Sequence, residues 1–310
     1  MAEDPLTARC KWLEKQCGFR LPTSLVQLAR FLMTDGRGLL DELKLRATGP
    51  LAMLLAQEAP SRLDDPTGLN IPFLEARHAR DLPELFTFLE GREDGLHWGL
   101  LWDRPADPPR GVASFCSQDQ SPLRLHAGVY AAVLDIIADQ LAMIPEQIED
   151  DPDHEAEHKA RIPVLRNRDL ALRAHATKSG VSLEEQRGRG LASDTGLDLI
   201  TPPSPQPPSA GTDGLKRLEK PADIKAVCQA ALSGVDHGRP YDAILVGRSL
   251  FFWKDASHRE TAGVLLDRGY AAIGNHALAR VLAAHLEQLE DLEGVHSDDS
   301  DVEEEEEEPA

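Results

Sequence analysis

The sequence predicts an α+β protein, with an antiparallel sheet flanked by helices in its N-terminal half. A mainly helical C-terminal α+β domain and a disordered acidic tail are expected to follow. Strand-like runs concentrate in residues 84–117, helical patterns lie on both sides of them, and an all-acidic run closes the chain. Helices segregated from an antiparallel sheet are typical of this fold class. A chain of 310 residues can form one large or two ordinary domains.

Three helices are predicted around the expected sheet. Residues 6–17 and 23–34 are separated by a Gly-Phe-Arg-Leu-Pro break, and leucines recur at helical spacing in the second segment. Thr23 or Ser24 can cap that second helix. The apolar run at 127–143 predicts a third helix that covers one face of the sheet.

The strands are expected to form a meander. A short strand is predicted at 43–47, and Pro50 can open a helical turn after it. Residues 84–90 and 96–103 flank a polar turn with an Asp-Gly pair, which favours a hairpin. A Pro-rich loop then leads to a further strand at 111–117.

The C-terminal half is predicted to be mainly helical. Helices are expected near 163–178 and at 222–232, 258–272 and 275–292, the last with a clear apolar face. The continuous apolar run at 244–253 is interpreted as a buried β-like segment. The predicted division of the chain is an N-terminal domain (1–145), an acidic linker (146–159), a C-terminal domain (160–294) with a Pro-rich connector (202–208), and an acidic tail (295–310).

The formal net charge of −20 at pH 7 is concentrated in two segments. Residues 297–310 hold nine acids and no base, and residues 146–158 hold seven more acids and no base. An acidic chain disfavours direct binding of nucleic acid through a basic surface. The tail either attracts a basic protein partner or keeps the protein soluble.

No complete active site is evident in the sequence. Residues 154–158 (HEAEH) match the zinc motif H-E-x-x-H, but they lack an apolar helix face and a third ligand, which favours a solvated linker helix. His97 alternates with apolar side chains and is predicted to be a sheet-face residue. The sequence has neither a P-loop motif nor a G-x-S-x-G motif.

No transmembrane or secretory segment is expected, and four scattered cysteines form no disulfide framework. The protein is therefore expected to be soluble and intracellular, in the nucleus of a eukaryote or the cytoplasm of a bacterium.

Several collinear patches carry a resemblance to a known family. They include LEKQCGFRLPTSLVQLARFL (13–32), LKLRATGPLAMLLA (43–56), DLPEL (81–85), PADIKAVC (221–228) and LVGRSLFFWKDASHRETAGVLLDRGY (245–270). Taken together, they resemble the histone PARylation factor family. Members of that family dock onto a poly(ADP-ribose) polymerase, complete its active site and direct ADP-ribose to serine. The resemblance thus implies an accessory protein without a cofactor of its own, because NAD belongs to the partner enzyme.

The family resemblance also suggests site residues. The family carries an Asp-Glu pair about a dozen residues before the Gly-x-x-Leu-Phe run, and counting back from that run gives Asp236 and His237 here. The Asp is kept and the Glu is replaced. Three alternatives stay open: the imidazole acts as the base, the serine-directing chemistry is lost or changed, or Asp242 or Glu260 supplies the carboxylate.

The resemblance further implies basic residues that engage the polymerase. Lys216 and Arg217 are the nearest candidates before the helix expected at 221, and solvated loop charges are the alternative interpretation. The basic N-terminal extension of animal members is missing, and the acidic tail is a further departure from the family pattern.

A second resemblance covers residues 8–145, which look similar to SMI1/KNR4-like immunity domains. Such proteins bind and neutralise toxins, many of them basic, and an acidic binder suits that role. This alternative leaves residues 160–294 without an explanation.

Overall fold

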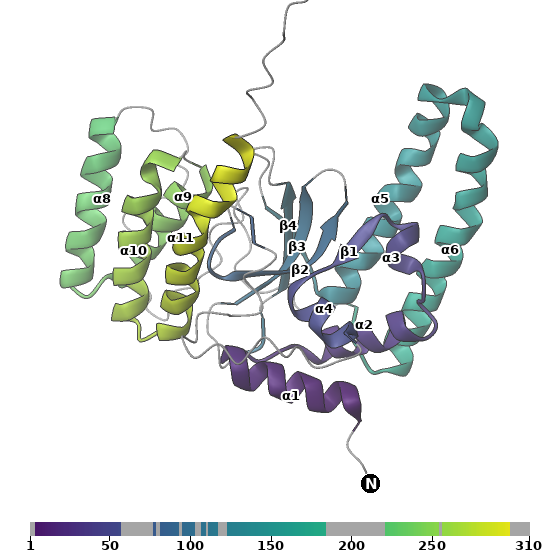
Figure 1. Cartoon of the computed structure of the whole chain (residues 1–310), viewed down its shortest axis with the longest axis horizontal. Coiled ribbons are helices and arrows are strands. Elements are labelled where there is room, and N and C mark those ends of the chain that lie inside the picture. The colour runs from purple at the N-terminus through teal and green to yellow at the C-terminus, as the bar shows by residue number, and fades with distance from the viewer. Residues whose placement is uncertain are drawn as a thin grey trace, which may run out of the picture.

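The computed structural model describes residues 4–56, 77–78, 81–92, 95–102, 107–109, 111–116, 123–183, 221–253 and 256–297. The Pro-rich connector, Lys216, Arg217 and the acidic residues after 297 lie outside these ranges. The predicted α+β class is confirmed, with a five-stranded antiparallel sheet in the N-terminal half and helices in the described part of the C-terminal half (Figure 1).

Among the described residues, four helices precede or interrupt the first strand pair: α1 (Pro5–Cys17), α2 (Thr23–Met33), α3 (Leu39–Glu42) and α4 (Gly49–Leu55). The predicted helices at 6–17, 23–34 and after Pro50 are confirmed. The predicted side-chain cap on α2 is wrong, because Pro22 occupies the N-cap position and no side chain bonds the first turn. Instead, the Leu25 amide donates to the Pro22 carbonyl at 3.0 Å, which makes the cap at Thr23 or Ser24 unnecessary.

The sheet has the order β1-β2-β3-β4-β5, and every neighbouring pair is antiparallel. Its strands are β1 (Leu45–Ala47), β2 (Leu85–Gly91), β3 (Leu96–Leu101), β4 (Gly111–Cys116) and β5 (Arg124–His126). The meander was predicted, but β5 was not. A strand of three residues that includes Arg124 and His126 carries almost no alternating apolar signal.

Both faces of the sheet are covered. On one face, the Phe86 ring lies 4.6 Å from Phe19 and 4.9 Å from Trp102. On the other face, Phe115 contacts Phe252 of the C-terminal helices, with ring centroids 5.2 Å apart. Figure 1 shows the sheet between the C-terminal helices and the helices of the N-terminal half. Cover on both faces explains why the strands are continuous apolar runs rather than alternating ones.

A long helical hairpin follows the sheet: α5 (Val129–Asp150), the 3₁₀ turn η2 (Pro152–His154) and α6 (Glu155–Lys178). The segment predicted as an acidic linker, 146–159, forms the end of α5, η2 and the start of α6. The α6 helix packs on α5 and, through a 2.5 Å ion pair between Arg168 and Glu42, on α3. The structure therefore groups α6 with the N-terminal half, whereas the sequence had assigned residues from 160 onward to the second domain.

The C-terminal half contains α8 (Pro221–Asp236), α9 (Pro240–Trp253), η3 (Ala256–His258), α10 (Arg259–Ala272) and α11 (His276–Ser297). The predicted β-like segment at 244–253 is wrong, because these residues belong to α9. Residues 242–252 are all buried, so their sequence shows no polar face from which a helical period could be recognised. Among the described residues, no helix combines the length and apolar composition that crossing a bilayer requires.

Candidate functional site

Asp236 and His237, the two residues suggested by the family resemblance, lie at the turn between α8 and α9. Asp236 ends α8, and Gly238 follows in the left-handed conformation with φ of 76°. The His237 amide donates to the Gly234 carbonyl at 3.1 Å, and the Arg239 amide donates to the same carbonyl at 2.8 Å. These bonds satisfy carbonyls at the helix end and hold the turn in a defined shape.

The side chains of this turn are exposed. Asp236 forms a 2.9 Å ion pair with Arg268 of α10, and its side chain is 65% accessible. His237 Nδ1 lies 2.7 Å from the Ser233 carbonyl oxygen. Since a carbonyl only accepts hydrogen bonds, Nδ1 carries the hydrogen, and Nε2 of the neutral ring holds the lone pair. That nitrogen could accept a proton from an incoming hydroxyl group.

The other predicted site residues differ in accessibility and position. Asp242, in the first turn of α9, is buried, and its carboxylate lies 3.6 Å from Arg239 Nε. Glu260 is exposed in the first turn of α10, at the opposite end of that helix from Arg268 and so away from His237. The structure therefore places Asp236 and His237 side by side in the turn, with Asp242 buried in the following helix and Glu260 apart.

A set of buried polar residues, which the sequence interpretation missed, lies where the sheet meets the C-terminal helices. In its first part, His97 Nε2 lies 2.7 Å from Asp81 Oδ1, and both side chains are fully buried. Asp81 also accepts hydrogen bonds from the His78 amide at 3.1 Å and the Thr87 hydroxyl at 3.2 Å. His97 is on a sheet face, as predicted, but its ring is fixed by a carboxylate.

The pKa shifts of this pair both favour the charged forms. Burial by itself would raise the pKa of Asp81 and lower that of His97. Their mutual attraction and hydrogen bond outweigh the burial, so the pKa of Asp81 falls below its ordinary value and that of His97 rises. The His97 Nδ1 atom lies 3.0 Å from the Gly95 carbonyl oxygen, so both ring nitrogens face acceptors, which suits an imidazolium.

The second part of this set connects the two halves of the chain directly. Arg248 Nε of α9 donates to Glu84 Oε1 at 2.8 Å, and the Tyr270 hydroxyl of α10 donates to the same oxygen. The side chains of Arg248 and Glu84 are 1% and 2% accessible. Burial raises the pKa of Tyr270, and the adjacent Glu84 charge raises it further, so the phenol stays neutral and donates.

Arg77 and His285 complete the set. The Arg77 guanidinium donates to the Leu85 carbonyl at 2.8 Å and to His285 Nδ1 of α11 at 3.3 Å. Burial and the nearby Arg77 charge lower the pKa of His285 to about 3, so this ring is neutral. We call the whole set the polar seam: Arg77, Asp81, Glu84, His97, Arg248, Tyr270 and His285.

Segments that carry the family resemblance meet in the polar seam. Glu84 belongs to the 81–85 patch, and Arg248 and Tyr270 belong to the 245–270 patch. These partners are 164 and 186 positions apart in the chain. The sequence did contain one signal for the polar seam, which is the charged Arg248 inside an apolar run. A charged residue that is buried with its apolar neighbours needs a polar partner.

Ser114, His126 and Asp135 form a further hydrogen-bonded chain, which resembles a hydrolase triad in composition. His126 Nε2 lies 2.9 Å from Ser114 Oγ, and His126 Nδ1 lies 2.6 Å from Asp135 Oδ2. However, Ser114 is buried, whereas the Asp135 side chain is 42% accessible. A catalytic triad needs the opposite arrangement, with the serine facing substrate. This chain instead ties β4 and β5 to α5.

The H-E-x-x-H residues do not converge on one point. His154 Nδ1 lies 2.9 Å from Asp151, whereas Glu155 pairs with Lys159. Within the described part of the chain, no group of three or more His, Cys, Asp or Glu side chains is placed to hold a metal ion.

Comparison with known proteins adds no relative. No protein-family model matches the chain, and no curated protein matches it.

Proposed function

We propose that the chain is an accessory protein that binds an ADP-ribosyltransferase of the poly(ADP-ribose) polymerase type and modulates or redirects protein ADP-ribosylation. In this proposal Asp236 and His237 enter the edge of the partner's active site, and the partner holds NAD. The protein contributes side chains rather than an independent activity. The proposal rests on the family resemblance and on the α8–α9 turn.

The observation that carries the proposal is the combination of exposure and fixed geometry at this turn. A side chain that completes another protein's active site must project from the surface and still keep a defined orientation. The turn is held by backbone hydrogen bonds to Gly234, by the Arg268 ion pair and by the bond from His237 to the Ser233 carbonyl. Nε2 of the exposed His237 ring could then take a proton from an acceptor hydroxyl.

The test adds the purified full chain to a poly(ADP-ribose) polymerase, NAD and a serine-bearing peptide. We expect the amount or the position of peptide modification to change. Changing His237→Ala should abolish the effect, because the proposed proton acceptor is lost. His154→Ala is the matched control: His154 is also an exposed histidine bonded within its own turn, but it lies in η2, away from the C-terminal helices (Figure 1).

A second variant, His237→Glu, restores the carboxylate that the family resemblance implies at this position. It should increase serine modification above the wild-type level if the turn occupies the expected place in the partner. Identical modification with and without the chain, or equal activity of the His237→Ala and His154→Ala variants, would rule the proposal out.

The immunity-protein alternative predicts a different result. A toxin-neutralising protein would bind a basic toxin tightly and would leave ADP-ribosylation unaffected. The antiparallel sheet with flanking helices in the N-terminal half is compatible with both functions, but the α8–α9 turn contributes nothing to this alternative.

A further inference from the structure

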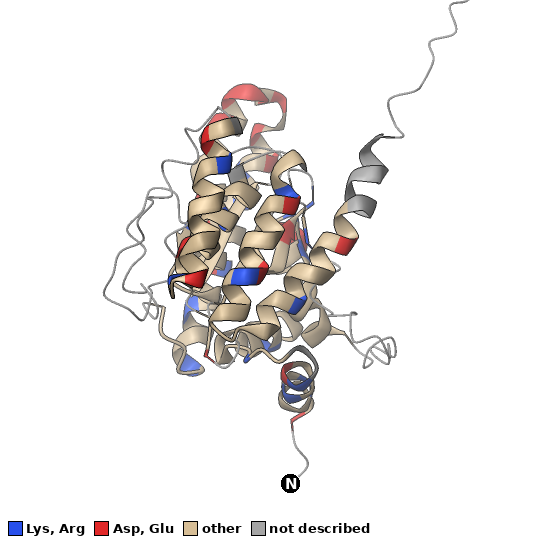
Figure 2. Cartoon of the chain, turned by 90° about the vertical axis from the view of Figure 1, so that its left-hand side faces the viewer, with Lys and Arg blue, Asp and Glu red and all other residues tan. Residues whose placement is uncertain are grey.

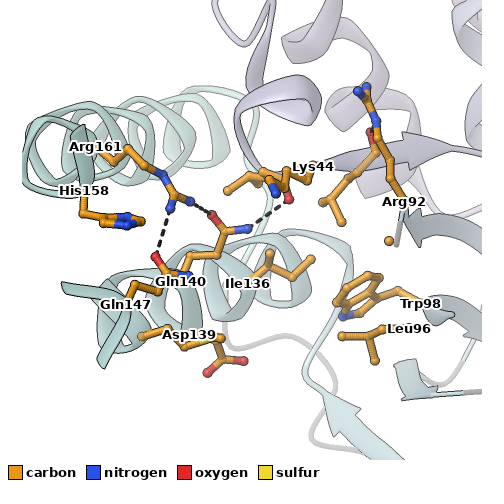
Figure 3. Close-up of a pocket in the computed structure, with 14 residues that line it drawn as sticks. Lys44, Arg92, Leu96, Trp98, Ile136, Asp139, Gln140, Gln147, His158 and Arg161 are labelled. Atoms are coloured by element: carbon orange, nitrogen blue, oxygen red, sulfur yellow. Dashed lines mark hydrogen bonds between the residues drawn. The ribbon is translucent and has the colours of Figure 1, made fainter. Parts of the chain in front are cut away.

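A cavity of about 380 Å³ opens between α5, α6 and the end of the sheet where β1, β2 and β3 meet (Figure 3). It is on the N-terminal side of the molecule and shares no residue with the α8–α9 turn or the polar seam. Its volume falls in the range of cavities that bind small molecules, about 300–1,000 Å³. Its wall is formed by one face of α5, the first turns of α6 and the ends of β1, β2 and β3.

One part of the wall is apolar. Trp98 of β3 and Ile136 of α5 are buried in the core at 5% and 6% accessibility, and each contributes to the cavity wall. Leu96 lies beside Trp98, and Met143 lines the cavity with a side chain that is 51% accessible. Figure 3 shows Trp98 and Leu96 on the strand side, opposite the side chains of α6. An aromatic or aliphatic group could pack against this part of the wall.

The opposite part of the wall is polar and cationic. Arg161 of α6 donates to Gln140 Oε1 at 2.9 Å and to Gln147 Oε1 at 3.1 Å, as the dashed lines in Figure 3 indicate. Both partners are neutral amides, and Arg161 forms no ion pair within the residues that the structure describes. A guanidinium that is positioned by neutral side chains keeps its full charge for a ligand.

His158 supplies a second polar group next to Arg161. It is one α-helical turn before Arg161 on α6 and also contributes to the cavity wall. Its Nδ1 atom is buried and has no hydrogen-bond partner among the residues that the structure describes. A buried nitrogen without a partner costs free energy that a bound ligand atom could recover.

The charges around the cavity have the opposite sign to the whole chain. The lining includes Lys44, Arg92 and Arg161 but only one acid, Asp139, whereas the full chain has 33 basic and 53 acidic residues. Asp139 is paired with Arg124, and Arg92 is paired with Asp41, so Lys44 and Arg161 supply most of the positive charge. A cationic cavity in an acidic protein selects for an anion.

We propose that this cavity binds a small organic anion, with its acidic group on Arg161 and His158 and its apolar body against Trp98. A carboxylate or a phosphate monoester can supply the acidic group, because a guanidinium pairs with both. The inference is independent of the proposed accessory function, because it concerns a separate site with its own residues.

The test is calorimetric titration of the full chain with four compounds. Decanoate and phenyl phosphate carry an acidic group on an apolar body, decanol lacks the charge, and inorganic phosphate lacks the apolar body. At least one of the first two should bind at least tenfold more tightly than decanol and inorganic phosphate, and the preferred one identifies the acidic group. No binding by either, or equal binding by decanol or inorganic phosphate, would overturn the proposal.

Two variants, each with a matched control, locate the site. Arg161→Gln should weaken binding of the preferred compound at least tenfold, because a charge-assisted contact is lost. Arg166→Gln removes the same charge from an exposed position of α6 outside the cavity and should leave affinity within twofold. Equal effects of the two variants would contradict the assignment.

Met143→Glu adds a negative charge at an exposed position of the cavity wall without disturbing the core and should also weaken binding. Val164→Glu is its control, because Val164 is 43% accessible on α6 and does not line the cavity. Unchanged affinity in Met143→Glu would place the ligand elsewhere. Circular dichroism of all four variants establishes that the fold is retained.

Discussion

Two arginine–carboxylate pairs, one in the polar seam and one at the α8–α9 turn, consist of the same groups in different surroundings. Arg248 and Glu84 have side-chain accessibilities of 1% and 2%, and Arg268 and Asp236 have 53% and 65%. The buried pair needs its partner, because an unpaired charge in the interior is strongly destabilising. The exposed pair contributes little to stability because water solvates both of its charges. The seam thus holds the sheet and the C-terminal helices together, and the turn remains available to another molecule.

The largest expected difference between the two regions comes from removing one arginine from each pair. Arg248→Met leaves Glu84 buried without its charge partner and should lower the free energy of unfolding by about 3–5 kcal/mol. Arg268→Met, the matched change at the surface, should lower it by about 1 kcal/mol or less. Urea denaturation followed by circular dichroism measures both values. Similar losses in the two variants would mean that the seam has no special role in stability.

The response to pH should also separate the seam from the surface. Because the pKa of His285 falls to about 3 in the folded protein, the unfolded chain binds an additional proton below about pH 6.5. Through this group, the free energy of unfolding should therefore fall by about 1.4 kcal/mol for each pH unit below about pH 6.5. Above about pH 6.5, His285 is neutral in both states and causes no loss of stability. His285→Gln keeps a hydrogen-bond acceptor for Arg77 and should abolish the part of the pH dependence of stability that is due to His285.

His97 contributes a pH dependence of stability with the opposite sign. Because His97 is present in both wild type and His285→Gln, its contribution cancels when the two proteins are compared. Its raised pKa stabilises the fold below about pH 6.5 and loses that effect as the pH increases through the folded value. Denaturation curves at pH 7.0, 5.5 and 4.5 would measure the difference. Parallel pH profiles for the two proteins would contradict the neutral, buried state of His285.

A smaller contrast concerns two glycines. A Cβ on Gly247 of α9 would lie 2.8 Å from Leu266 Cγ and 3.1 Å from the Ala262 carbonyl oxygen of α10. Gly247→Ala should therefore destabilise the fold by about 1–3 kcal/mol through overpacking, less any gain in helix propensity. Gly238→Ala meets no atom within 4 Å but has φ of 76°, so only about 1 kcal/mol of backbone strain is expected. Thermal unfolding of both variants tests this order, and the reverse order would disprove the close packing of α9 on α10.

Most elements were predictable because they depend on local patterns. The leucine spacing in α2 and the antiparallel pairing of β2 with β3 were recognised from short windows of sequence. The α9 segment was misread because burial on all sides removes the polar face that distinguishes a helix from a strand. The packing of α6 on α5 was not recognised from the sequence because only Leu165, Leu172 and Ala176 are buried along α6, which gives a weak apolar pattern.

The sites were less predictable than the elements. Asp236 and His237 could be proposed because a family resemblance identified them, not because their local sequence is distinctive. Glu84 pairs with Arg248, which lies 164 positions later in the chain, and no local sequence pattern connects residues so far apart. The cavity depends similarly on residues from two helices and three strands, which no local sequence pattern connects.

The two edge strands, β1 and β5, restrict how a partner can be recognised. Each has three residues and forms an outer border of the sheet. An incoming peptide that extends a sheet needs a longer row of open backbone groups than such borders offer. Any partner protein is therefore expected to contact side chains on helices and turns. Its specificity should depend on a few projecting residues rather than on main-chain pairing.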